Sequence, residues 1–322
     1  MAAMVAIVDI YSQAAGLPWR LPIDQQSRSY HQLLSAGLPA GAISWRLRRG
    51  RIQRPYHGRY IPGPDLPGLW GRAQAALMDS PHSVLGFHTA AQLHGFGVAP
   101  TESIHLLTQA GGPFPQRRGV TAHQTVLPIG PPVRIVGLPC ASAARVAVDL
   151  ARSLPRFDAL PVLDAALFAG AVTPEDLLIE VGRHDGLRGV RQARELVAVA
   201  DGRAECRQES QLRLLLTDAG IRDYVPQLPV RDDTGCVRCR LDLGDPHHMI
   251  AAEYDGSSHL SRQRLQQDRW RHNWLEQRGW AMRYFTSSDL YHSPHQILST
   301  LAAARRSRAY RRPWRSSNDD TP

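Results

Sequence analysis

Apolar residues recur at two different spacings along the chain, and these spacings predict where helices and strands lie. Between residues 30 and 61, two short stretches with helical spacing, YHQLLSAGL and PAGAISWRLRRG, come before the alternating stretch RIQRPYHGRYI. Two short helices followed by a small hairpin are the parts of a winged helix-turn-helix. We therefore predict that residues 25–63 form an N-terminal winged helix-turn-helix domain.

The middle of the chain, residues 69–200, has the pattern of an α+β region. It follows the turn-rich stretch PGPDLPG, and its helical patterns are interrupted by two strand-like stretches, SIHLLTQ and GVTAHQTVL. The helix in TPEDLLIEVG is expected to begin with Thr173 as its N-cap and Pro174 as its first residue. His88 and His94 lie on a mostly apolar helical stretch and are interpreted as structural. No function is predicted for this region.

The segment 205–308 combines helices and strands in an order that predicts a mixed sheet. The helix ESQLRLLLTDAG is followed by three strands, which include VRCRLDLG and MIAAEYDG. The helix SRQRLQQDRWRHNWLEQRG, the strand WAMRYFTSSDL and a helix from about residue 294 come next, and residues 309–322 form a basic and then polar tail. The fold class predicted for the whole chain is therefore mixed α/β, with a C-terminal α/β domain of this kind.

Charge adds a class of partner to this picture. The 322 residues carry a formal net charge of +9, and every one of their basic residues is arginine or histidine, because the chain has no lysine. No acid occurs between Gly41 and Tyr60, where the arginines are Arg46, Arg48, Arg49, Arg51, Arg54 and Arg59. In a winged helix-turn-helix the second helix enters a major groove and hairpin arginines meet phosphates, so DNA is the predicted partner. The alternative is a solvated basic domain that binds nothing in particular.

Other features of the composition bear on location and metal content. The apolar runs are shorter than a membrane span and no basic segment precedes them, so we expect a cytoplasmic protein with no membrane partner. Four cysteines are too few for a disulfide framework in a chain of this length. Cys236 and Cys239 form a CxxC, but in a regular strand they point to opposite faces, so we do not expect zinc.

The stretch AAEYDGSSHL, residues 251–260, has acids at alternate positions. In a strand, Glu253 and Asp255 share one face, and Asp242 near the end of the preceding strand is a third acid close by. Converging carboxylates repel one another unless a cation or a proton lies between them, and Mg²⁺ is held by oxygen ligands of this type. The alternative is that these acids line the solvated face of an edge strand, and spacing alone does not decide between the two.

The ordered set of polar residues in this segment resembles the very-short-patch-repair (Vsr)-like branch of the PD-(D/E)XK endonucleases. The resemblance implies a restriction-endonuclease-like fold, Mg²⁺ or Mn²⁺ as cofactor, and Asp242, Glu253 and Asp255 as metal ligands. His259 would act as a general acid or base or would bind phosphate. Glu209 would orient a metal-bound water, and Asp268 and Arg271 would form a supporting pair or contact phosphate. The chain departs from the family in having Tyr284 where an arginine is usual. The matching residues are Glu209, Asp242, Glu253, Asp255, His259, Asp268 and Arg271.

The first 200 residues resemble a different family. AISWRLRRGRIQRPYHGRY and GLPCASAARVAVDLA look like recurrent stretches of AbiEi-like type IV antitoxins, which have an N-terminal winged helix. The ordered acid set in a basic chain favours a DNA-binding, Mg²⁺-dependent endonuclease-like protein with an N-terminal winged helix. One alternative is an AbiEi-like antitoxin or transcriptional regulator with a non-catalytic nuclease fold and a cognate toxin as partner. The other is an RNA-processing nuclease.

Overall fold

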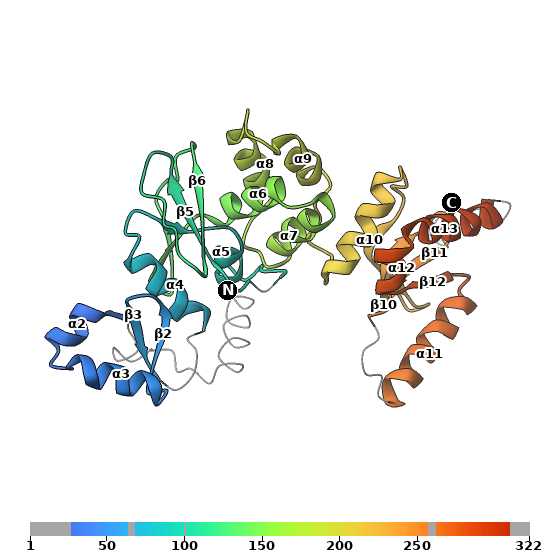
Figure 1. Cartoon of the computed structure of the whole chain (residues 1–322). Coiled ribbons are helices and arrows are strands. Elements are labelled where there is room, and N and C mark those ends of the chain that lie inside the picture. The colour runs from blue at the N-terminus through green and yellow to red at the C-terminus, as the bar shows by residue number, and fades with distance from the viewer. Residues whose placement is uncertain (1–26, 64–67, 100, 257–261, 310–322) are drawn as a thin grey trace. The chain divides into compact units, whose positions relative to one another are not determined.

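The computed structural model describes residues 27–63, 68–99, 101–256 and 262–309. They form two compact units. The first contains the described residues up to Ser153 together with Ala169–Val197, and the second contains Leu154–Phe168 and the described chain from Ala198 onward. The chain is thus a mixed α/β protein, as predicted, and Figure 1 labels most of its helices and several of its strands.

The start of the first unit is a small helical and β-sheet subdomain around the arginine-rich segment. A capping box between Ser29 and Gln32 begins its first helix, and buried Leu33, Ile43 and Ile52 form part of its core. Its three-stranded antiparallel sheet has the order β1-β3-β2. The elements are β1 (Arg28–Ser29), α2 (Tyr30–Ser35), α3 (Ala40–Arg48), β2 (Ile52–Tyr56) and β3 (Arg59–Pro62). Two helices and a hairpin thus lie where the apolar pattern predicts them, while residues 64–67 of the expected linker are outside the described residues.

The rest of the first unit is a five-stranded mixed sheet with helices packed against it and against one another. The sheet order is β6-β5-β4-β8-β7, with β5 and β6 parallel. Helix α6 is buried along most of its length and contacts α5, α8 and α9 (Figure 1). The elements are α4 (Leu69–Met78), β4 (Val84–Leu85), α5 (Phe87–Leu93), β5 (Ile104–Gln109), β6 (Val120–Thr125), β7 (Val133–Ile135), β8 (Leu138–Cys140), α6 (Ala143–Ser153), α8 (Pro174–Arg183) and α9 (Val190–Val197).

Helix α8 begins as its sequence predicts. The Thr173 side chain accepts a hydrogen bond from the backbone N–H of Asp176 at 3.1 Å, and the Asp176 side chain accepts one from the backbone N–H of Thr173 at 2.8 Å. Pro174 is the first helical residue, where its missing N–H removes no intrahelical bond.

The second unit contains a four-stranded mixed sheet of order β12-β11-β10-β9, in which only the β11–β12 pair is parallel. Its elements are α7 (Arg156–Phe168), α10 (Arg207–Asp218), β9 (Val225–Arg231), β10 (Val237–Asp245), β11 (Ile250–Tyr254), α11 (Arg262–Gln277), β12 (Ala281–Phe285), α12 (Ser287–His292) and α13 (Pro294–Ala309). The stretch WAMRYFTSSDL, predicted to be one strand, ends as a strand at Phe285, because Thr286 caps α12 through a box with Asp289.

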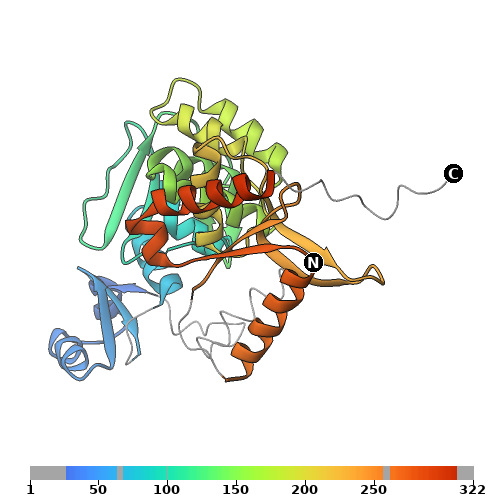
Figure 2. The ribbon, with the colours of Figure 1, turned by 90° about the vertical axis from the view of Figure 1, so that its right-hand side faces the viewer.

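This sheet has an apolar layer on each face. Ile250 and Ala252 pack with Leu212 of α10 and Leu301 of α13. Ala251, between them in sequence, points the other way and packs with Leu275 of α11. Figure 2 shows the red helix α13 and the orange helix α11 on opposite sides of the strands. Alternate residues of β11 therefore face opposite layers, as the period-2 pattern predicts.

No helix among the described residues is both long enough and apolar enough to cross a membrane.

Candidate functional site

The arginine-rich segment presents most of its guanidinium groups to solvent. Arg46 and Arg48 lie on α3, Arg49 caps its C-terminus, Arg51 follows in the turn, and Arg54 is on β2; all five are exposed. The guanidinium carbons of Arg49 and Arg51 lie 5.9 and 5.0 Å from the centre of the exposed Trp45 ring. The segment therefore exposes five guanidinium groups to solvent, two of them beside an exposed indole ring.

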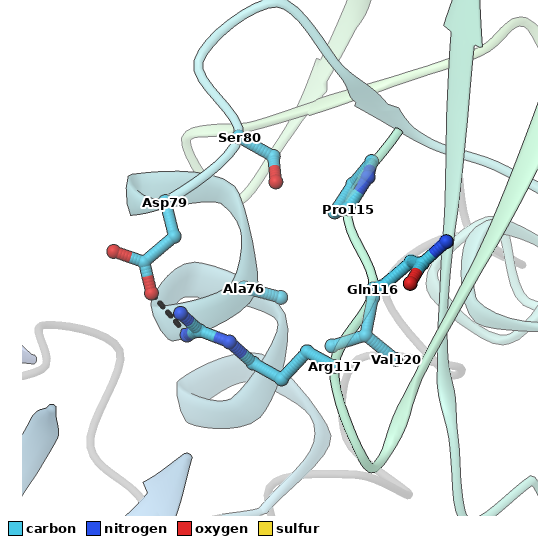
Figure 3. A pocket seen from close by; sticks show the side chains of 7 residues that line it. All are labelled: Ala76, Asp79, Ser80, Pro115, Gln116, Arg117 and Val120. Carbon is cyan, nitrogen blue, oxygen red and sulfur yellow. Dashed lines mark hydrogen bonds and ion pairs between the residues drawn. The ribbon is translucent and has the colours of Figure 1, made fainter. Parts of the chain in front are cut away.

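Arg59, the sixth arginine of the set, has a different environment. Its side chain is only 11% exposed, and its Nε donates to Asp79 Oδ1 at 2.8 Å. Arg117 pairs with the other oxygen of the same carboxylate, as Figure 3 shows, beside a pocket of about 130 Å³. Burial would raise the pKa of Asp79, but the hydrogen bonds from the two arginines outweigh burial and hold this pKa below its usual value. Arg59 therefore joins the hairpin to the end of α4 and is not displayed as the other five are.

The acid set in the second unit converges in part. The β10–β11 register places Asp242 opposite Glu253, next to the pair Leu243 and Ala252. The backbone N–H of Asp242 donates to Glu253 Oε1 at 3.1 Å, and the backbone N–H of Tyr254 donates to Asp242 Oδ2 at 2.9 Å. Glu253 is 4% exposed. The two carboxylates are thus held side by side by backbone donors.

The charge state of this pair is perturbed by its surroundings. Burial, and then the neighbouring charges of Glu253 and Glu209, raise the pKa of Asp242 to about 7. Burial also raises the pKa of Glu253, although Arg271 opposes the shift. Glu209, buried in the first turn of α10, accepts hydrogen bonds from the Glu205 backbone and the Gln227 side chain, each at 3.0 Å. The charge of Glu209 therefore raises the pKa of both Asp242 and Glu253, as a nearby like charge does.

Arg271 is the cation that meets this acid pair. Its Nη2 donates to Glu253 Oε2 at 2.8 Å and to the Arg240 carbonyl at 2.7 Å. Sequence spacing suggested a pair with Asp268, but the structure pairs Arg271 with Glu253; the side chain of Asp268 is outside what the structure describes. The geometry of α11 against β11 determines this partner, and no helical spacing could reveal it.

The remaining predicted site residues are more scattered. Asp255 lies just beyond β11, where its backbone N–H donates to Phe285 at 2.8 Å and its side chain is exposed. His259 lies outside the described residues. Tyr284 is next to Glu253 in the parallel register, and its hydroxyl is 3.0 Å from His272 Nδ1.

The donor set does not match a magnesium site in this arrangement. Both oxygens of Glu253 are engaged, one by a backbone N–H and the other by Arg271. Within the described residues, no group of three or more His, Cys, Asp or Glu side chains has the arrangement of a metal site. Of the two CxxC cysteines, Cys236 precedes β10 and Cys239 lies on it, and a register irregularity lies between Val237 and Cys239, so the strand is not regular at this point.

Sequence reasoning missed a cluster of imidazoles in the first unit. His105 Nδ1 and His123 Nε2, on adjacent strands β5 and β6, lie 2.9 Å apart, and the His88 ring meets that of His105 edge-on. Phe87 stacks on His123 with a ring separation of 3.6 Å and has a left-handed φ of 47°. Burial is the main cause that lowers the pKa of both His105 and His123 to about 4. The alternation of the two strands could have placed these residues, but their register could not be read from sequence.

Comparison with known proteins matches the middle of the chain to a family model. The family model of the AbiEi antitoxin C-terminal domain matches residues 83–199, which include the imidazole cluster. A crystal structure of RV2827C protein from Mycobacterium tuberculosis is similar with a TM-score of 0.42 at 15% identity, covering 64% of this chain and 79% of that chain.

Two relatives match most of the chain. Uncharacterized protein MT2308 and Uncharacterized protein Rv2248, from two strains of Mycobacterium tuberculosis (CDC 1551 / Oshkosh and ATCC 25618 / H37Rv), are each 32% identical over 259 residues. The match covers 80% of this chain and 93% of either relative. The chain therefore belongs to the same family as these two mycobacterial proteins, and its residues 83–199 match the model of the AbiEi antitoxin C-terminal domain.

Proposed function

We propose that this protein is an AbiEi-like type IV antitoxin or transcriptional regulator that binds duplex DNA through its arginine-rich segment. The observation that carries the proposal is the set of five exposed arginines on α3, the following turn and β2, with no acid from Gly41 to Tyr60. The match of residues 83–199 to an antitoxin domain supports it. The winged-helix assignment of residues 25–63 is part of the same proposal.

The geometry of the segment suits a duplex. An α-helix fits the major groove of B-DNA, and α3 carries Arg46 and Arg48 on exposed positions. Arg49 and Arg51, held over the Trp45 ring, flank the helix end, where guanidinium groups meet phosphates. Arg59 anchors the hairpin to Asp79 and so orients this surface.

Replacing Arg46 and Arg48 together with alanine tests the proposal. Each phosphate contact contributes about 0.9 to the slope of log K against log salt concentration, so the double variant should bind a labelled duplex more weakly, with a slope shallower by up to about 2. Fluorescence anisotropy over a salt series measures both quantities. Arg194→Ala, which removes an exposed arginine of α9 paired with Asp185, is the matched control. Equal slopes for the double variant and the wild type would contradict the proposal.

The antitoxin reading also implies a protein partner. We propose a toxin encoded beside this gene, and co-expression tests it. A neighbouring gene that stops growth when expressed alone should cease to do so when this protein is present. Continued growth arrest in its presence would contradict the antitoxin role but not the regulator role.

A second candidate is a Mg²⁺-dependent endonuclease, and one specific observation favours it. Asp242 and Glu253 lie side by side with pKa values raised first by burial and then by neighbouring acids, Glu253 and Glu209 for Asp242 and Glu209 for Glu253, which is the perturbation seen at many catalytic carboxylates. The ion pair between Arg271 and Glu253 weighs against it. Supercoiled plasmid tests the candidate: nicking by the wild type in Mg²⁺ or Mn²⁺, lost with a chelator and in Glu253→Gln, would establish it. Intact plasmid under all conditions would remove it.

RNA is the remaining alternative substrate. Because A-form RNA has a deep, narrow major groove that side chains do not read, duplex DNA should compete better than structured RNA for α3. Stronger competition by RNA would support the RNA-processing alternative.

A further inference from the structure

Two tryptophans and two arginines form a stack on the surface of the second unit. The rings of Trp270 and Trp274 on α11 are 20° from parallel, with centres 6.4 Å apart. The guanidinium carbon of Arg238, on β10, lies 5.8 Å from the centre of the Trp270 ring, and that of Arg278 lies 4.0 Å from the centre of Trp274. These four residues are called the tryptophan stack below.

The tryptophan stack combines side chains from α11, the residue that follows it, and β10, and packing holds part of it in place. Residues four apart on a helix lie on the same face, which brings the two indoles together. Trp274 also packs against the apolar layer that contains Leu275 and Trp280, so its ring is anchored. Trp270, the other tryptophan of the pair, is 55% exposed. A large aromatic ring presented to solvent beside fixed cations is typical of a binding surface.

The charges around the stack favour an anionic ligand. Arg238 and Arg278 pair with Asp232 and Asp233 at 3.4 and 3.1 Å, but Arg238 and Asp233 are exposed, and such surface pairs are weak. Arg240 and Arg269, on the same two elements, are exposed and have no ion-pair partner among the described residues. Phosphate groups can therefore compete for these guanidinium groups.

We propose that the tryptophan stack binds unpaired bases of a single-stranded nucleic acid. Bases stack on indole faces regardless of sequence, and flanking guanidinium groups contact the backbone and the rings. A duplex hides the faces of its bases, so this surface selects single strands. The proposal goes beyond duplex binding by α3 and does not rest on it, because it concerns different residues in the other unit.

The test is fluorescence anisotropy of the full chain with a labelled oligothymidylate of about 16 nucleotides. An abasic oligonucleotide of the same length has the same charge but no rings to stack. Trp270→Ala should weaken binding of oligothymidylate about tenfold and leave binding of the abasic strand unchanged. Phe168→Ala, which removes an exposed aromatic ring of the same unit outside the stack, should bind both strands as the wild type does.

Arg238→Gln provides a second variant on a different element and should weaken oligothymidylate binding as well. Thermal melting of each variant shows whether it is folded. The proposal is overturned if folded Trp270→Ala binds oligothymidylate with wild-type affinity. It is also overturned if the wild type binds the abasic strand as tightly as oligothymidylate. Binding of neither strand would overturn it too and would leave a protein partner as the occupant of this surface.

Discussion

At the scale of single residues, Asp242 shows how burial changes the charge state of a side chain. Its pKa is raised to about 7, so the folded protein keeps it protonated over a range in which the unfolded chain has already ionised it. The stabilising contribution of this group is therefore fully present below about pH 4 and is lost as pH rises through about 7.

Asp242→Asn should remove the loss of folding stability that the wild type shows as pH rises through about 7. Asparagine keeps an oxygen that can accept the Tyr254 backbone hydrogen bond but never carries a charge. The variant should be more stable than the wild type at pH 8 by a few kcal/mol and nearly equal to it at pH 4, since a tenfold change in an acid constant corresponds to about 1.4 kcal/mol. Urea unfolding at both pH values measures the difference, with Asp255→Asn as the exposed control. If the variant is no more stable than the wild type at pH 8, ionisation of Asp242 does not destabilise the folded protein, which contradicts the prediction.

Asp149 is the opposite case, a buried carboxylate that stays charged. It is 1% exposed, and Arg145, Arg152 and His184 contact it at 2.7, 3.0 and 3.3 Å. Burial would raise the pKa of Asp149, but the hydrogen bonds and charges of these partners lower it.

Asp149→Ala should therefore destabilise the first unit by about 3–5 kcal/mol, because it leaves the buried Arg145 without its partner. Asp185→Ala removes an exposed ion pair with Arg194 and should cost less than about 1 kcal/mol. Denaturant unfolding of the two variants compares them directly. Similar losses would mean that the buried network contributes no more than a surface pair.

At the scale of elements, helix α8 depends on its first turn. Thr173→Ala removes the hydrogen bond to the Asp176 backbone and should destabilise the protein by about 1 kcal/mol. Thr173→Ser, which keeps the hydroxyl, should restore most of that loss. Thermal unfolding measures both variants, and an unchanged midpoint for Thr173→Ala would argue against the cap.

The junction of α5, β5 and β6 should make the first unit sensitive to acid. The unfolded chain binds protons on its histidines below about pH 6.5, whereas burial keeps His105 and His123 neutral down to about pH 4. The stability should therefore be at its full value above about pH 6.5 and fall as the pH approaches 4.

His123→Gln should reduce this dependence while lowering stability at pH 7.5, because it loses the ring stack with Phe87. His82→Gln, which changes an exposed histidine, is the control. Urea midpoints between pH 7.5 and pH 5 give the comparison. A steep loss of stability that persists in His123→Gln would place the acid sensitivity elsewhere.

Elements were predictable where a local pattern determines them. Periodicity located α2, α3, α10 and β11, and the Thr173 cap was readable because capping involves residues three apart. The end of β12 was misplaced because the Thr286 cap competes with a strand-like pattern. The partner of Arg271 and the anchoring of Arg59 by Asp79 were not readable, since both depend on contacts between elements distant in sequence.

At the scale of the whole molecule, sequence placed the cationic segment and the acid pair in separate parts of the chain. The structure adds that α7 belongs with the C-terminal elements, because it packs against α10. Sequence could not show this, since α7 follows α6 directly and only tertiary packing separates them. We therefore propose that the first unit binds duplex DNA. The acid pair and the tryptophan stack belong to the second unit.

Hydrogen–deuterium exchange of the full chain, measured with and without duplex DNA, tests this proposal most directly. The account predicts slower exchange in residues 40–56, which include α3 and β2, and unchanged exchange in β10, β11 and β12. Protection confined to β10, β11 and β12, with residues 40–56 unaffected, would contradict it and would make the acid pair of the second unit the site that meets DNA.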